Sequence, residues 1–450
     1  RGVVVTDPFV PATVNVATMV AATEDLLIAT PHLARVLKLP IRRNLQNRWP
    51  TNAAALQWAV DELWPKLNHH LLAYNAPDWP YLIDYLVAHR AFSFWITGPV
   101  DGSASLGGLL PDLLVSARAE CGEPPIGAPL AEQLVIERLL AKAPPNIGCL
   151  GAPYNGVGVG IGEGPGVSLL TRYGKFLAWS AQNANLTVHS GAAVASLPSP
   201  ERRGAGGEAP LDRTKVYLTC LISDGDAPIN WYAFFPLRYW DDPVRGTFPL
   251  NWSTGPAVHD LLPDVVDWYR TRANDSDGFV AACSGAGYCY PDAFASQYAD
   301  AEALFRDYLA LTEVSMARLS LRGLWTHTAT GERLGAFAQQ VPSVSFLLPD
   351  YSRLPATTAE NANEVLAGRI PSFRALTSFN MDLGEAATMQ LMLDDLRAYT
   401  PVQRPAFMHV FVQCYPWSPT KLRGVLEALG PEYVPVRADE MARLYLESRP

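Results

Sequence analysis

The chain has 450 residues, of which 49% are hydrophobic and 18% are charged, and its formal net charge is −9. This composition excludes wholesale disorder, and the length predicts two domains because one hydrophobic core rarely organises so many residues. Lys and Arg form no cluster along this acidic chain, which argues against nucleic acid as a partner.

The chain contains no stretch of about 18 consecutive apolar residues, the length that a membrane-spanning helix requires. Even the largely apolar run of residues 14–28 contains Glu24 and Asp25, so no membrane span is predicted. The chain opens at Arg1 without a signal pattern, from which we expect a processed form that has lost any export signal.

Strand and helix patterns alternate in the first part of the chain, which is typical of a parallel α/β sheet. Strands are expected at residues 2–6, 25–29, 70–74 and 91–96, and helices at residues 12–22, 52–67 and 79–89. The pattern predicts an N-terminal parallel-sheet α/β domain over residues 1–145, which ends at a Pro-rich connection.

Short apolar strand patterns, each followed by a loop and a helical stretch, continue to the end of the chain. They lie at residues 147–151, 186–189, 216–222, 279–283, 323–326, 343–348, 376–380 and 407–414. Seven or eight such repeats predict an irregular (β/α) barrel-like domain over residues 146–450. Catalytic groups of such a barrel lie on loops at the carboxyl ends of the strands.

Cysteines and glycosylation sequons indicate whether a chain is secreted into an oxidising compartment. Six cysteines without a CxxC pair are too few for a disulfide scaffold and argue against a cysteine-ligated metal. Two couples could form local disulfides or remain buried thiols, namely Cys283 with Cys289 and Cys121 with Cys149. Sequons, which favour a secreted glycoprotein if the host is eukaryotic, begin at Asn185, Asn251 and Asn274.

Two carboxylates, Asp224 and Asp226, stand directly after the strongly apolar strand predicted at residues 216–222. Such a pair can act as acid and base or nucleophile in glycoside cleavage, or can hold a hard cation such as Ca²⁺ or Mg²⁺. The alternative is a plain Asp-Gly turn with no chemical role. The position of both acids at the end of a buried strand favours a chemical role over a plain turn.

A glycine-rich segment with two tyrosines, residues 284–291, follows the strand predicted at residues 279–283. Its small residues allow a sharp turn that displays Tyr288 and Tyr290, which could stack on a sugar, with Asp292 beside them. A structural turn anchored by aromatic packing is the alternative. A phosphate cradle fits poorly, because Tyr and Pro interrupt the backbone amides and no Lys-Ser/Thr follows.

Taken together, the two motifs resemble those of the GxGYxYP family of putative glycoside hydrolases. Residues 285–291, Gly-Ala-Gly-Tyr-Cys-Tyr-Pro, match the signature that names the family, and Ser-Asp-Gly-Asp at residues 223–226 resembles its SDGDN element. The likeness extends to residues 2–5, 15–18, 173–175, 185–190, 409–412 and 438–447. The resemblance implies α/β N-terminal parts, a barrel-like C-terminal domain, export and polysaccharide use.

One departure from the family concerns the acidic motif, since Ala227 and Pro228 follow where the family usually has Asn, and Asn230 comes later. The resemblance also indicates Glu163, in the glycine-rich loop of residues 156–166, as the partner of Asp224. That loop could close over a substrate. A flexible surface loop with one solvated acid is the alternative.

Further polar groups are expected at strand ends, and two tryptophans could stack on sugars: His189, Asp350, Asn380 and Gln413, with Trp231 and Trp417. Each has a structural alternative, a hydrogen-bonded histidine or a core tryptophan.

The prediction is a glycoside hydrolase acting on a poly- or oligosaccharide through Asp224, Asp226 and Glu163, with Tyr288, Tyr290, Asp292, His189 and Trp231 binding the sugar. No cofactor is expected, although Asp224 and Asp226 could hold a divalent cation. The chain is expected to be secreted or extracellular, with carbohydrate as its partner and protein partners possible in an extracellular assembly. The alternatives are a non-catalytic carbohydrate-binding or structural protein and a metal-dependent deacetylase.

Overall fold

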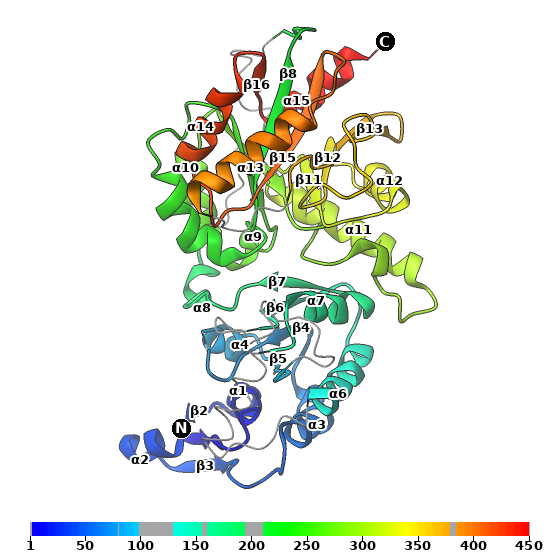
Figure 1. Cartoon of the computed structure of the whole chain (residues 1–450). Coiled ribbons are helices and arrows are strands. Elements are labelled where there is room, and N and C mark those ends of the chain that lie inside the picture. The colour runs from blue at the N-terminus through cyan, green and yellow to red at the C-terminus, as the bar shows by residue number, and fades with distance from the viewer. Residues whose placement is uncertain are drawn as a thin grey trace. The chain divides into compact units, whose positions relative to one another are not determined.

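The computed structural model describes residues 2–79, 81–98, 129–154, 160–193, 210–378 and 384–449 (Figure 1). The chain divides into two compact units. Unit 1 comprises Arg1–Val188 and Ala293–Leu304, and unit 2 comprises His189–Asp292 and Phe305–Pro450.

Unit 1 contains two parallel sheets. The first has the order β2-β1-β3 and the second the order β5-β4-β6-β7. Their strands are β1 (Val3–Val5), β2 (Leu27–Ala29), β3 (Ile41–Asn44), β4 (Asn68–Tyr74), β5 (Ala91–Phe94), β6 (Ile147–Gly151) and β7 (Lys175–Trp179). The helices are α1 (Thr13–Glu24), α2 (Pro31–Leu37), α3 (Asn52–Glu62), α4 (Ile83–Ala88), α6 (Pro129–Lys142) and α7 (Glu163–Arg172). The predicted N-terminal parallel α/β fold is confirmed.

The division between the units does not coincide with the boundary predicted at residue 145. Strand β6 was predicted to open the barrel, but it pairs with β4 and β7 inside unit 1. A five-residue apolar run forms a buried strand in either sheet, and its pairing partner is not encoded locally. The backbone amide of Ala295 donates to the carbonyl of Thr171 at 2.8 Å, which ties the later segment Ala293–Leu304 to unit 1.

Unit 2 is built on a curled sheet of mainly parallel strands. Its order is β13-β14-β12-β11-β10-β9-β8-β15, with β16 also paired to β8, and only β13 and β14 pair antiparallel. A parallel bridge between Ala375 and His409 joins the segment after β14 to β15, so the sheet curls back on itself. The predicted barrel-like fold is confirmed. The strands are β8 (Val216–Ile222), β9 (Leu250–Thr254), β10 (Asp277–Ala281), β11 (Gly323–Thr326), β12 (Phe346–Pro349), β13 (Asn363–Leu366), β14 (Ile370–Phe373), β15 (Ala406–Val412) and β16 (Tyr433–Pro435).

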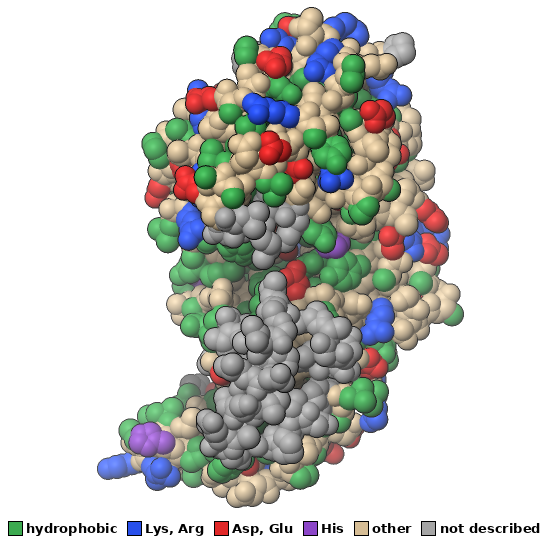
Figure 2. All heavy atoms as spheres, in the orientation of Figure 1, with side chains coloured by type: hydrophobic (Ala, Val, Ile, Leu, Met, Phe, Trp, Pro, Cys, Tyr) green, Lys and Arg blue, Asp and Glu red, His purple; other side chains and the backbone are tan. Residues whose placement is uncertain are grey.

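Helices connect these strands, as Figure 1 shows for α13 and α14 beside β8 and β15. They are α9 (Val258–Leu261), α10 (Pro263–Arg272), α11 (Ala301–Arg318), α12 (Gly331–Gln340), α13 (Glu385–Ala398), α14 (Pro419–Leu429) and α15 (Ala438–Ser448). Local sequence sets several starts: Thr330 and Ser418 cap α12 and α14 through their hydroxyl oxygens. On the face in Figure 2, basic and acidic side chains are interspersed over the described residues.

Two predicted strands are wrong. Residues 186–189 form the short helix α8 (Leu186–His189), because four residues cannot distinguish the two periodicities. The strand expected at residues 376–380 lies earlier as β14, and residues 376–378 are irregular. Asn380 lies outside the described residues.

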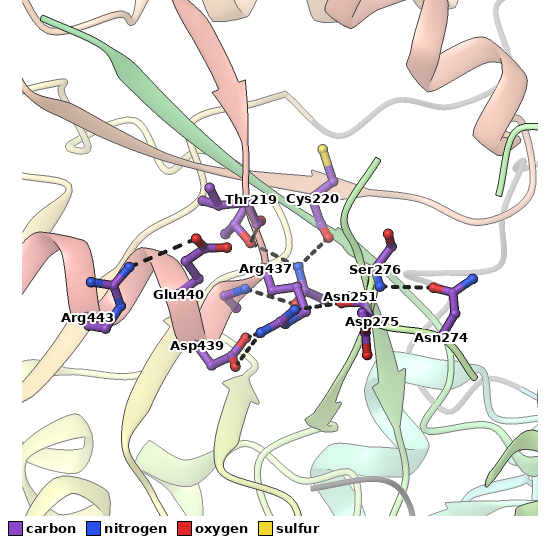
Figure 3. A network of polar contacts seen from close by, with 12 residues as sticks. Thr219, Cys220, Asn251, Asn274, Asp275, Ser276, Arg437, Asp439, Glu440 and Arg443 are labelled. Atoms are coloured by element: carbon purple, nitrogen blue, oxygen red, sulfur yellow. Dashed lines mark hydrogen bonds and ion pairs between the residues drawn. The ribbon is translucent and has the colours of Figure 1, made fainter. Parts of the chain in front are cut away.

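A buried asparagine joins the strands β8 and β9 to the turn before α15 (Figure 3). Asn251 donates from Nδ2 to Thr219 Oγ1 and to the Cys220 carbonyl, both at 2.9 Å. Its Oδ1 accepts from the backbone amide of Ala438 at 3.0 Å. Asn251 is 1% exposed, so this sequon is inaccessible to glycosylation in the folded chain.

Replacing Asn251 with Leu should lower the free energy of unfolding by about 1–3 kcal/mol, because the substitution leaves buried backbone groups of Cys220 and Ala438 without partners. Urea unfolding measures the loss. The control is Gln339→Ala, at an exposed residue of α12, which should change stability by less than about 0.5 kcal/mol. Equal stability of the two variants would contradict the role of Asn251.

Replacing His409 should flatten the acid dependence of stability. The side chain is fully buried, and burial lowers its pKa to about 4. The unfolded chain therefore binds a proton that the folded chain rejects, and stability falls as pH drops from 6.5 towards 4. The loss is about 3 kcal/mol at most. Thermal unfolding across this range should show a weaker slope in His409→Gln than in His32→Gln, at an exposed site. Parallel slopes would contradict this prediction.

Candidate functional site

The carboxyl ends of the unit 2 strands meet at one edge of the curled sheet, called here the barrel mouth. We define it by the side chains that follow these strands: Asp224, Asp226, Ser284, His327, Asp350, Arg374, Gln413 and Cys414. Several contacts cross from one strand end to the next. The thiol of Cys414, after β15, lies 3.5 Å from Asp224 Oδ2, after β8. The backbone amide of His327, after β11, donates to Ser284 Oγ, after β10, at 3.0 Å.

Asp224 is a partly buried carboxylate with a raised pKa. Burial disfavours its charged form, and hydrogen bonds from Ser223, Cys414 and Tyr415 offset only part of this effect. The residue adopts a left-handed backbone conformation, with φ +62°. The raised pKa favours retention of a proton, the property that a general acid requires.

Asp226 lies close to two buried thiols. Burial above all raises the pKa of Cys283, after β10, and that of Cys414, after β15, and the negative charge of Asp226 adds to both shifts. Gly225 permits the close approach of this turn to β9, since a Cβ there would lie 1.7 Å from the Ser253 carbonyl oxygen. The Asp-Gly-Asp segment is therefore both a tight turn and the element that carries the two acids.

Asn230 bears on the departure from the family motif. Although Ala227 and Pro228 follow Asp226, the Asn230 amide donates to the Asp224 carbonyl at 2.7 Å. An asparagine thus contacts the acidic turn from a later position in the sequence.

The glycine-rich motif is held by α11. The backbone amide of Gly287 donates to the Tyr308 hydroxyl at 3.3 Å, and that hydroxyl lies 2.8 Å from the Gly287 carbonyl and 3.0 Å from that of Ser284. Thr312 Oγ1 accepts from the Ala286 amide at 3.1 Å. These bonds explain why the motif turns sharply after β10.

The turn contributes to an aromatic group that consists of Tyr288, Tyr290, His327 and Tyr351, in which Tyr288 is 7% exposed and the other three side chains are partly buried. His327 lies between the others, with ring centroids 5.9 Å from Tyr288, 4.8 Å from Tyr290 and 4.9 Å from Tyr351. The sequence indicated the two motif tyrosines but not His327 or Tyr351. Both follow short strands at their carboxyl ends, a position that could have indicated them.

Other predicted sugar-binding residues have structural contacts. Trp231 is fully buried and donates its indole N–H to the Ser253 carbonyl at 3.1 Å, so its ring offers no exposed face for stacking. Trp417 is likewise buried, at 2% exposure. Asp292 is exposed and accepts hydrogen bonds from the amide and hydroxyl of Thr330 at the start of α12. His189 Nδ1 lies 2.7 Å from Asp264 Oδ2.

Glu163 belongs to unit 1, where it is the exposed first residue of α7. Its pairing with Asp224 stays a prediction.

The cysteines of the described residues are buried free thiols, including Cys283 and Cys289. The alternative of buried thiols therefore holds for that couple, whereas Cys121 lies outside the described residues.

In the part of the chain that the structure describes, no cluster of three or more His, Cys, Asp or Glu side chains could hold a metal. A divalent cation at Asp224 and Asp226 stays a prediction.

An irregular α/β barrel with acids and aromatic rings at the carboxyl ends of its strands is the class that fold and site define. A model described as "GxGYxYP putative glycoside hydrolase C-terminal domain" matches residues 214–446. Models described as "GxGYxYP_N second domain" and "GxGYxYP third domain" match residues 1–67 and 69–191. The chain therefore belongs to the GxGYxYP family.

A solved structure supports the fold assignment. It is described as a putative hydrolase from Bacteroides thetaiotaomicron, is 18% identical, and aligns with a TM-score of 0.77 over 99% of this chain and 80% of that chain. No curated protein matches the sequence. Among the described helices, none is both long and apolar enough to span a membrane.

Replacing Gly285 with Ala should destabilise unit 2 by about 1–3 kcal/mol. Gly285 has φ +119°, and a Cβ there would lie 2.5 Å from Thr312 Oγ1. The matched control is Gly335→Ala in α12, where a Cβ would meet no atom within 4 Å and the substitution should stabilise the helix by about 0.5–1 kcal/mol. Thermal unfolding measures both variants, and a gain in stability at position 285 would contradict the steric argument.

Proposed function

We propose that this chain hydrolyses glycosidic bonds in a poly- or oligosaccharide at the barrel mouth of unit 2. The observation that carries the proposal is the presentation of Asp224 and Asp226 by one tight turn at the end of the buried strand β8. Membership of the GxGYxYP family supports the same reaction class. Paired carboxylic acids are the groups that most glycoside hydrolases use.

Asp224 is the proposed general acid. Burial raises its pKa, so its proton is available to the leaving-group oxygen of the glycosidic bond. Asp226 is then the base or nucleophile, and the role that the sequence indicated for Glu163 stays a prediction. Tyr288 is the proposed residue that positions the sugar, because its ring belongs to the aromatic group at the neighbouring strand end.

Release of reducing ends from plant, algal and microbial polysaccharides tests this assignment. Wild type should release sugars, and Asp224→Asn and Asp226→Asn should each lower the rate by at least about 100-fold, because each removes one carboxylate function. Glu163→Gln decides between Asp226 and Glu163 as the second acid. The control is Asp267→Asn, at an exposed residue of α10 that pairs with Arg270, and it should keep the wild-type rate.

If no polysaccharide is cleaved while sugars still bind to all these variants, the non-catalytic carbohydrate-binding alternative replaces the hydrolase. The substitution of Ala227 and Pro228 for the family's asparagine is the observation that favours this second candidate. Dialysis against a chelator distinguishes a third case. Hydrolysis without a cofactor should survive it, whereas a reaction that depends on a cation at Asp224 and Asp226 should not.

A further inference from the structure

The aromatic group at the barrel mouth has one polar ring, His327, whose nitrogens make no hydrogen bond within the described part of the chain. Its ring stacks near Tyr288 with an interplanar angle of 24° and meets Tyr290 edge-on at 77°. Tyr351 lies against it at 39°. No described residue hydrogen-bonds to either ring nitrogen, and the His327 side chain is only partly buried.

These rings come from three successive strand ends, and local bonds fix the positions of His327 and of the loop that carries Tyr288 and Tyr290. Ser284 Oγ holds the backbone of His327. The hydroxyl of Tyr308 holds the loop that carries Tyr288 and Tyr290, whose own hydroxyl oxygens lie 3.5 Å apart. A site of this kind is organised before its ligand arrives, which reduces the entropy lost on binding.

The charges around this group include the carboxylates of Asp224, Asp226 and Asp350 and the guanidinium groups of Arg353 and Arg374. Arg374, after β14, donates to Asp350 Oδ2 at 2.8 Å, and Asp350 is fully buried after β12. This ion pair balances the charge of Arg374, whereas Arg353, two residues after Tyr351, lies with its Cζ 4.1 Å from the centroid of the Tyr399 ring. Asp224 and Asp226 remain on the β8 side. The mouth therefore favours an uncharged ligand over an anionic one.

We propose that Tyr288, Tyr290, His327 and Tyr351 form a subsite for an uncharged sugar ring, in which His327 exchanges hydrogen bonds with the sugar hydroxyls. The inference rests on the proposed function and names its substrate class, a neutral glycan rather than a uronate or sulfated one. The partly buried rings of Tyr290 and Tyr351 supply apolar faces for a pyranose, with Tyr288 packed behind them at 7% exposure, and the imidazole supplies polar groups that distinguish hydroxyl positions.

The protonation state of His327 agrees with this role. Burial lowers its pKa to about 4, so the imidazole is neutral at neutral pH. A neutral imidazole has one N–H donor and one acceptor nitrogen, and a sugar hydroxyl can use both. A protonated ring would instead offer two donors and attract anions.

Calorimetric titration of the whole chain with soluble oligosaccharides tests the subsite. The neutral probes are cello-, xylo- and manno-oligosaccharides, and the anionic probes are oligogalacturonates and sulfated galactan oligosaccharides. At least one neutral probe should bind, at least about tenfold more tightly than every anionic probe. His327→Phe, which keeps a ring but removes both nitrogens, should weaken that binding about tenfold, the loss of one or two hydrogen bonds.

Two further variants separate binding from folding. His327→Gln keeps a donor and an acceptor and should recover part of the affinity, whereas His70→Phe, at an exposed histidine of β4, should bind like wild type. Wild-type affinity in His327→Phe, tighter binding of the anionic probes, or no binding of any neutral probe would each overturn the subsite.

The same probes distinguish this inference from the proposed hydrolysis. If neutral probes bind through His327 but are not cleaved, the subsite is supported and the proposed hydrolysis is contradicted. If His327→Phe cleaves the probes with an unchanged KM, the proposed hydrolysis is supported and the subsite is contradicted.

Discussion

Strand β8 is the constraint on which unit 2 depends, because three strands pair with it. Strand β15 follows it over its whole length, β16 pairs with its first three residues, and β9 pairs with its last two. The Asn251 side chain bonds to Thr219 and Cys220, which lie between the β8 residues that pair with β16 and those that pair with β9. This arrangement fixes the position of the end of β8. The turn that begins at Asp224 follows directly, so its position in the barrel mouth is also fixed.

The features that the sequence predicted well are those in which local chemistry and tertiary role agree. The seven apolar residues of β8 are all buried, so a hydrophobic run was a sufficient signal for a central strand. The glycine-rich motif was also visible, because φ +119° at Gly285 requires glycine whatever surrounds it. The parallel α/β fold and the barrel-like fold followed from alternating patterns of this kind.

The features that the sequence did not predict depend on tertiary contacts. Strand β9 was not predicted because its side chains Asn251 and Ser253 are polar. Both are buried, and residues far away in the sequence supply their hydrogen bonds. His327 was not predicted as a site residue because one polar residue after a four-residue strand carries no local signal. Its contacts with three aromatic rings, which indicate its role, depend on the tertiary fold. Trp231 shows the converse, since an aromatic residue beside an acidic motif packs into the core.

The most direct test of the account is a crystal structure of the Asp224→Asn variant with a bound neutral oligosaccharide. The account predicts that the sugar lies in the barrel mouth of unit 2, with one ring against Tyr288 and His327 and a glycosidic oxygen beside residue 224. A sugar bound elsewhere on the chain, with the barrel mouth empty, would contradict it.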